Sequence, residues 1–175
     1  MLLDLSKVLL QDGKALETSV ELEMNELVFQ MGKFSIARKS PLQVAVTNTG
    51  DRVLEIRGHG EVMLLIPCAR CLTPVEYPMV LDFERTADMK LSEEEREERL
   101  EETNFMEGEQ LNPEVLVRNE LLINWPVRVL CKDDCKGICS RCGANLNVTA
   151  CNCDTEQADP RMAAIRDIFS KYKEV

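Results

Sequence analysis

Eight cysteines are the residues of this 175-residue chain whose type and spacing are most suited to chemistry. A thiolate is a soft ligand, and a tetrahedral zinc site takes four ligands, which two close cysteine pairs on separate turns can supply. Two-residue gaps of the C-x-x-C kind are typical of such sites. The spacing therefore predicts two zinc ions per chain, each held by four cysteines. The cysteines form four close pairs: Cys68/Cys71, Cys131/Cys135, Cys139/Cys142 and Cys151/Cys153.

These pairs can be combined in more than one way. The four cysteines within residues 139–153 lie close in sequence and can close on one ion locally. That arrangement leaves Cys131 and Cys135 for Cys68 and Cys71, and the second ion would then link two distant parts of the chain. The spacing favours this pairing, with Cys135 in the local site as the alternative.

A zinc ion bound by four thiolates has no open position for water, and such closed sites are structural rather than catalytic. The remaining residues offer no catalytic motif. His59 is the single histidine and stands between two glycines, and the chain has no phosphate-binding loop, no G-x-S-x-G and no H-E-x-x-H. We therefore predict a protein that is not an enzyme. Two alternatives for Cys68 and Cys71 are a pair of small buried apolar residues and a redox C-x-x-C, although the βαβ setting of a redox motif is absent.

The charge of the chain restricts its partners. Lys and Arg number 21 against 31 Asp and Glu, a formal net charge of −10, and the acid is concentrated between residues 82 and 120. Nonspecific nucleic-acid binding needs clustered positive charge, whereas an acidic surface suits solubility or docking to a basic protein. The acidic run at 91–102 predicts a solvated helix or loop, with a partner-binding arm as the alternative.

The apolar pattern restricts the location of the protein. The first ten residues lack a basic segment followed by a long apolar core, so we expect no signal peptide. No apolar run reaches the 18 or so residues of a membrane span. We therefore expect a cytoplasmic protein, whose thiols stay reduced and favour metal over disulfides.

Alternating apolar residues from Leu42 to Phe83 predict the strands that must position the first cysteine pair. A turn cluster over 47–51 separates two strands, and the glycines flanking His59 predict a β-bulge. The pair Cys68/Cys71 then falls in a turn between two long antiparallel strands. Gly32 and Ser40-Pro41 predict a break over 30–41.

Two helix starts and a division of the chain complete the expected fold. Asn112-Pro113 predicts a helix beginning there, and Asp159-Pro160 predicts a last helix. The predicted fold class is α+β, an antiparallel curved or barrel-like sheet with helices and a C-terminal zinc-clamped segment. We expect a β-region with the acidic segment and one helix over 1–125, and a cysteine-rich zinc-binding segment with the last helix over 126–175.

The motifs PCARCL, CKDDCKGICSRCGANLN, CNC and DPRMAAI resemble the YceD family, over about residues 15–173. Members are bacterial and plastid proteins linked to accumulation of 23S ribosomal RNA and to large-subunit assembly. The resemblance implies a role in large-subunit assembly and an association with a small basic large-subunit ribosomal protein, but no molecular mechanism. We expect a non-enzymatic assembly factor that binds ribosomal RNA or a ribosome precursor, a small basic large-subunit ribosomal protein, or both. Some relatives keep the upstream C-x-x-C with His or Cys near 131 and 135 but lack the last four cysteines, which supports two separate sites.

Candidate RNA contacts are the basic residues of the cysteine-rich loops, Lys132, Lys136 and Arg141, with solvated loop charges as the alternative interpretation. Two other functions compete with ribosome assembly. A zinc-ribbon regulator that binds nucleic acid would need a basic face, which the net charge of −10 opposes. A thiol redox protein or zinc-responsive chaperone would need thiols that oxidise readily.

Overall fold

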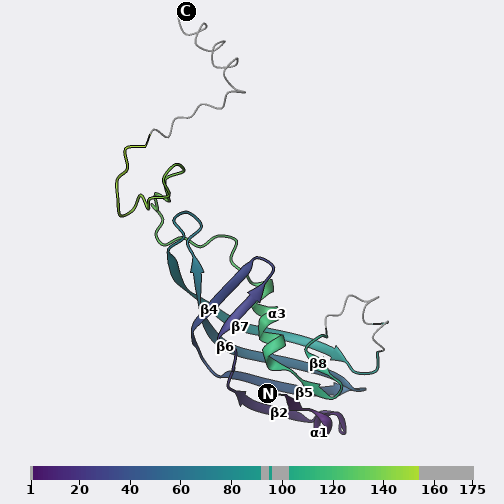
Figure 1. Ribbon diagram of the computed structural model, residues 1–175. Helices are drawn as coiled ribbons and strands as arrows, with labels where there is room; N and C mark the ends of the chain where they lie inside the picture. Colours follow the sequence, from purple (N-terminus) through teal and green to yellow (C-terminus); the bar gives the residue numbers. More distant parts are fainter. Residues whose placement is uncertain (1, 92–94, 96–102, 154–175) are drawn as a thin grey trace, which may run out of the picture.

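The protein is built on one antiparallel sheet with helix α3 lying across one face and the cysteine-rich segment at one end (Figure 1). The computed structural model describes residues 2–91, 95 and 103–153. Most of the acidic run at 91–102 and the predicted helix after Asp159 lie outside the described residues. The elements are β1 (Leu3–Asp4), α1 (Ser6–Leu9), β2 (Ala15–Val20), β3 (Glu26–Phe29), β4 (Gly32–Lys39), β5 (Leu42–Gly50), β6 (Val53–Pro67), β7 (Pro74–Asp88), β8 (Met106–Glu107), β9 (Gln110–Leu111) and α3 (Pro113–Ile123).

The long hairpin of β6 and β7 organises the sheet. β7 pairs with β6 along its whole length, from Val53↔Asp88 to Pro67↔Pro74. On the other edge of β6, β5 pairs with the first half and β4 with the second half. β2 lies outside β5, and β3 lies outside β4. The turn of this hairpin places Cys68 and Cys71 at one end of the sheet.

The sheet is open, so the expectation of a barrel-like sheet is wrong. Among the described strands β2, β3 and β7 each pair on one edge only, and the sheet shows no clear curvature. Closure would require the outer edge of β7 to pair with another strand. β7 contains Pro74 and Pro78, which have no N–H to donate, and proline in sheets is confined to edge strands for that reason. The antiparallel α+β class itself is confirmed.

One face of the sheet is apolar and α3 covers it. Alternate residues of β6, such as Leu54, Ile56 and Leu64, are buried, and their neighbours in sequence face outward. α3 adds Leu116 and Leu121 to the same core. Burial of this kind is the main stabilising contribution to such a sheet.

The predicted start of α3 is confirmed. The Asn112 side-chain oxygen accepts a hydrogen bond from the backbone N–H of Val115 at 3.3 Å, and Pro113 follows in the first turn. This N-cap satisfies one of the free N–H groups at the helix start. The segment that leads from α3 to Cys131 therefore leaves from a fixed point on the sheet.

Two local predictions in the β-region are wrong. Residues 32–39 form β4 rather than a break, because pairing with β6 and β3 outweighs the weak strand signal of the segment. The glycines flanking His59 make no bulge: the pairing of β6 with β5 and β7 runs through them without a shift. The irregularities lie elsewhere, between Ile36 and Arg38 and between Asn48 and Gly50.

Gly58 is a glycine for a packing reason. A Cβ at this position would lie 2.1 Å from the ring of Phe83, its partner on β7, whereas at Gly60 the nearest atom would be 3.4 Å away. We expect Gly58→Ala to lower the free energy of unfolding by about 1–3 kcal/mol, the usual cost of overpacking. Gly60→Ala is the matched control and should have a much smaller effect. Urea unfolding measures both, and equal midpoints for the two variants would contradict the packing argument.

Candidate metal centres

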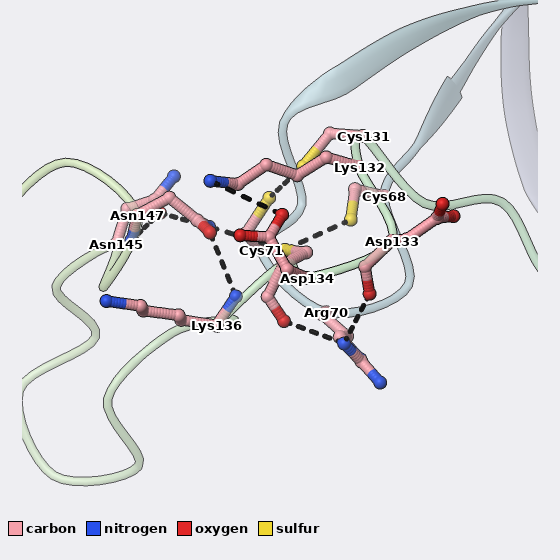
Figure 2. A network of polar contacts seen from close by, with 11 residues as sticks. Cys68, Arg70, Cys71, Cys131, Lys132, Asp133, Asp134, Lys136, Asn145 and Asn147 are labelled. Carbon is pink, nitrogen blue, oxygen red and sulfur yellow. Dashed lines mark hydrogen bonds and ion pairs between the residues drawn. The ribbon is translucent and has the colours of Figure 1, made fainter.

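The first cluster consists of Cys68 and Cys71 from the β6–β7 turn and Cys131 and Cys135 from the segment after α3. The Sγ atoms of Cys68 and Cys135 are 3.8 Å apart, and those of Cys71 and Cys131 are 3.5 Å apart. Three of the four residues are buried, and Cys131 is exposed. Figure 2 shows the turn and the segment meeting at these sulfurs.

The second cluster is local and consists of Cys139, Cys142, Cys151 and Cys153. In each cluster all four sulfurs lie within 4.8 Å of one another. The structure thus brings the eight sulfurs together in the two sets that the spacing favoured, and Cys135 belongs with Cys68. All eight cysteines are free thiols.

The geometry of both clusters fits a four-coordinate metal ion. A tetrahedral zinc ion with Zn–S bonds of about 2.3 Å needs sulfurs roughly 3.8 Å apart. In the first cluster the Cys71–Cys131 and Cys68–Cys135 sulfur separations, 3.5 and 3.8 Å, are close to that value. The donor set of four thiolates is also the one that structural zinc sites use. Each cluster could therefore hold one metal ion.

The two C-x-x-C turns have the same backbone geometry. The N–H of Leu72 donates to the carbonyl of Cys68 at 3.0 Å, and that of Gly143 donates to the carbonyl of Cys139 at 2.9 Å. The N–H of each first cysteine donates five residues ahead, to Thr73 at 2.8 Å and to Ala144 at 2.8 Å. Two turns far apart in sequence have thus converged on one conformation, which points both sulfurs of each pair to the same side.

This conformation also sets the acidity of the first cysteine in each turn. Burial by itself raises the pKa of the Cys68 thiol, but the backbone N–H groups of Arg70, Cys71 and Cys131 face the sulfur and lower the pKa to about 6. The N–H groups of Cys142 and Arg141 likewise lower the pKa of Cys139 to about 6. Both turns therefore present a thiolate near neutral pH.

The last sulfur to ionise in each cluster behaves in the opposite way. The Cys71 side chain raises the pKa of Cys131 to about 12, and the Cys142 side chain raises the pKa of Cys153 to about 12. Several thiolates within a few ångströms repel one another, so protons stay on these thiols. A divalent cation among the sulfurs would favour loss of those protons, which is why metal binding to cysteine clusters releases protons.

Leu72 occupies a position that suits glycine. Its φ is 62°, and the corresponding residue of the second turn is Gly143 with φ 72°. The left-handed region costs a non-glycine residue roughly 1–2 kcal/mol, and the Leu72 side chain is 62% exposed, so little burial offsets this. We expect Leu72→Gly to raise the free energy of unfolding by up to about 1 kcal/mol, and Gly143→Leu to lower it. Thermal unfolding of both variants checks this, and a destabilised Leu72→Gly chain would contradict it.

Polar contacts that the sequence alone did not reveal hold the first cluster together. The N–H of Ala69 donates to the carbonyl of Val129 at 2.9 Å. The guanidinium of Arg70 donates to the carbonyls of Cys135 at 2.8 Å and Asp133 at 3.3 Å (Figure 2). The segment before Cys135 is thus fixed to the hairpin turn by hydrogen bonds as well as by the sulfur contacts.

The three candidate RNA-contact residues are exposed but separately placed. Lys132 makes an ion pair with Asp134 at 3.7 Å. The backbone N–H of Lys136 donates to the Asn147 side-chain oxygen at 2.9 Å, and its side chain makes no ion pair within the described residues. Arg141 lies in the second turn. Whether any of the three contacts RNA stays a prediction.

The fold and the clusters define a small α+β protein whose sheet carries, at one end, two four-cysteine clusters able to hold metal ions. No helix among the described residues is long and apolar enough to cross a membrane. The family model described as "Large ribosomal RNA subunit accumulation protein YceD" matches residues 56–169, which include both clusters and α3. The chain therefore belongs to the YceD family. No curated protein and no solved structure matched the chain.

Proposed function

We propose that this protein is a non-enzymatic cytoplasmic factor for assembly of the large ribosomal subunit, and that each cysteine cluster holds a structural zinc ion. The family match, whose description names accumulation of large-subunit ribosomal RNA, carries the ribosomal part of the proposal. The four-thiol composition of each cluster supports the structural role, because a zinc ion with four thiolates has no position for a substrate.

We further propose that the cysteine-rich part, residues 126–175, works as a unit attached to the β-region, residues 1–125. This division is supported by the contacts between the two parts, because within the described residues the hydrogen bonds that cross from one part to the other gather at the β6–β7 turn. A zinc ion in the first cluster would then fix the orientation of the two parts.

The outward face of the sheet supports a basic protein as the partner. Arg57 makes ion pairs with Glu55 and Glu84, and Arg38 pairs with Glu76. Within the described residues, no ion pair neutralises Glu17 or Asp82. These two line a hollow of about 240 Å³ beside His59. Arg57 also lines the hollow, but Glu55 and Glu84 already neutralise its charge, so a Lys or Arg side chain of a partner would meet two free carboxylates there. The outward acids of the face include Glu17, Glu55, Glu61, Glu76, Asp82 and Glu84.

Charge favours this partner over ribosomal RNA. The end that carries the clusters has five basic residues against Asp133 and Asp134. Four thiolates around one Zn²⁺ leave about two negative charges per filled cluster, so two filled clusters would cancel most of the positive charge. RNA binding there would depend on single side chains rather than on a basic surface. The basic residues are Arg70, Arg128, Lys132, Lys136 and Arg141.

The full-length protein provides the test. Binding is measured to purified basic large-subunit ribosomal proteins and to a 23S ribosomal RNA transcript over a range of salt concentrations. We expect the chain to bind a basic ribosomal protein. The double variant Glu17→Gln/Asp82→Asn should weaken the affinity for that protein about tenfold, and the double variant Lys132→Gln/Lys136→Gln should leave it unchanged. The reverse pattern, RNA binding lost in the lysine variant only, would show that RNA is the partner. Binding to neither, together with no ribosomal material in purifications from growing cells, would overturn the proposed function.

A further inference from the structure

We propose that the two clusters are coupled: metal binding at the second cluster raises the metal affinity of the first, through the side chains of Asn145 and Asn147. The inference rests on the proposed zinc sites and adds that they do not fill independently. The two asparagines are not ligands themselves; they position the cysteines of the first cluster.

The first observation is where these side chains point. Both belong to the loop between Cys142 and Cys151 of the second cluster, yet both reach the first cluster (Figure 2). The Asn147 amide nitrogen donates to the Cys135 sulfur at 3.3 Å. The Asn145 amide nitrogen donates to the Thr73 hydroxyl oxygen at 3.3 Å, and that hydroxyl lies 3.3 Å from the Cys71 sulfur. The loop of the second cluster thus contacts the Cys135 sulfur directly and the Cys71 sulfur through the Thr73 hydroxyl.

The second observation is that the two side chains are held in place by each other. The Asn145 side-chain oxygen accepts from the backbone N–H of Asn147 at 3.0 Å and from its amide nitrogen at 2.8 Å. The Asn147 side-chain oxygen accepts from the Lys136 backbone N–H at 2.9 Å. Each Asn147 amide hydrogen therefore has a partner, one on Asn145 and one on the Cys135 sulfur.

The loop that carries them takes its position from the second cluster. The Cys139 N–H donates to the Ala144 carbonyl at 2.8 Å, and Ile138 forms a β-bridge with Asn145. The Leu146 N–H donates to the Gly137 carbonyl at 2.9 Å. The loop has little apolar anchoring of its own, since Val148 is 82% exposed. Closing four sulfurs on one ion would fix the turn at Cys139, and with it both asparagines.

The physical effect on the first cluster is positioning of its ligands. A donor held against a ligand sulfur fixes the orientation of that side chain, and groups that support ligands in this way change metal affinity by about 10–100-fold. Because binding at two coupled sites is reciprocal, metal in the first cluster must raise the affinity of the second by the same factor.

The test is a double-mutant cycle on the full chain. Asn147→Asp keeps the oxygen that accepts from Lys136 but replaces the donor to Cys135 by a carboxylate. Cys142→Ser opens the second cluster. Affinity of the first cluster is measured by Co²⁺ titration, which gives a sulfur-to-cobalt charge-transfer band, and by competition of Zn²⁺ with a chelator. Asn104→Asp on the exposed surface is the matched control, because it makes the same charge change away from both clusters.

We expect each substitution alone to lower the metal affinity of the first cluster about tenfold or more. The double variant should lower that affinity little further, and the control should leave it unchanged. If the Cys142→Ser chain fails to fold, Asn147→Asp with all eight cysteines intact gives the same information through stepwise chelator release of its two ions. Unchanged affinity in Asn147→Asp, or effects that multiply in the double variant, would overturn the coupling. A wild-type chain that binds no metal would instead overturn the proposed zinc sites.

Discussion

Replacing Cys71 by serine is expected to remove about one of two zinc ions per chain and to free the segment after α3 from the β6–β7 turn. Cys71 shares its cluster with Cys131, which follows α3 in the sequence, and the two sulfurs are 3.5 Å apart. Structural zinc contributes roughly 10–16 kcal/mol of apparent binding free energy in small peptides. The hydrogen bonds that Ala69 and Arg70 donate to this segment contribute only about 1 kcal/mol each, far less than the ion, so loss of the ion should release the segment.

The same result is expected for Cys135→Ser. The Cys71→Ser/Cys135→Ser double variant should lose no more zinc than either single variant, because all three lack the same ion. Elemental analysis counts the metal. Hydrogen exchange at Ala69, whose N–H is bonded to the Val129 carbonyl, reports release of the segment. Ser140→Ala, an exposed change beside a ligand of the other cluster, is the control. Metal losses that add in the double variant would show that Cys71 and Cys135 hold different ions.

Replacing Cys142 by serine is expected to remove the other ion and to unfold the loop over 138–153, while the sheet keeps its structure. The loop offers little apolar burial to replace the ion: Ile138 is 40% exposed and Val148 is 82% exposed. None of the residues that form the main core comes from the loop. Loss of protection should therefore stop at the loop and at the first cluster's contacts with Asn145 and Asn147.

Circular dichroism, thermal unfolding and hydrogen exchange separate these effects. Strand signal and the main unfolding transition should stay near wild type, the loop amides of Cys139 and Leu146 should exchange faster, and the remaining ion should be held more weakly. A Cys142→Ser chain with wild-type metal content and unchanged exchange in the loop would show that the second cluster has no structural role.

The sequence by itself determined the local features of this protein. The C-x-x-C spacing is enough to fold each turn so that both sulfurs point the same way, because the hydrogen bonds that define the turn lie within six residues. Asn112 followed by proline determined where α3 begins, since an N-cap acts on its own helix. Alternation along 53–66 determined which face of β6 is buried. All three depend on neighbours in the chain.

Only the tertiary structure decided which pairs share a cluster. The spacing allowed Cys135 to join either set; the length of the β6–β7 hairpin and the direction in which the chain leaves α3 place its sulfur 3.8 Å from that of Cys68. The reason for Gly58 is likewise tertiary: the glycine suggested a bulge, but the Phe83 ring on the neighbouring strand occupies the space of its side chain. Asn145 and Asn147 looked like ordinary loop residues, and only the meeting of two turns 72 residues apart shows what they contact. Contacts of this kind depend on how separate elements pack, which local spacing does not encode.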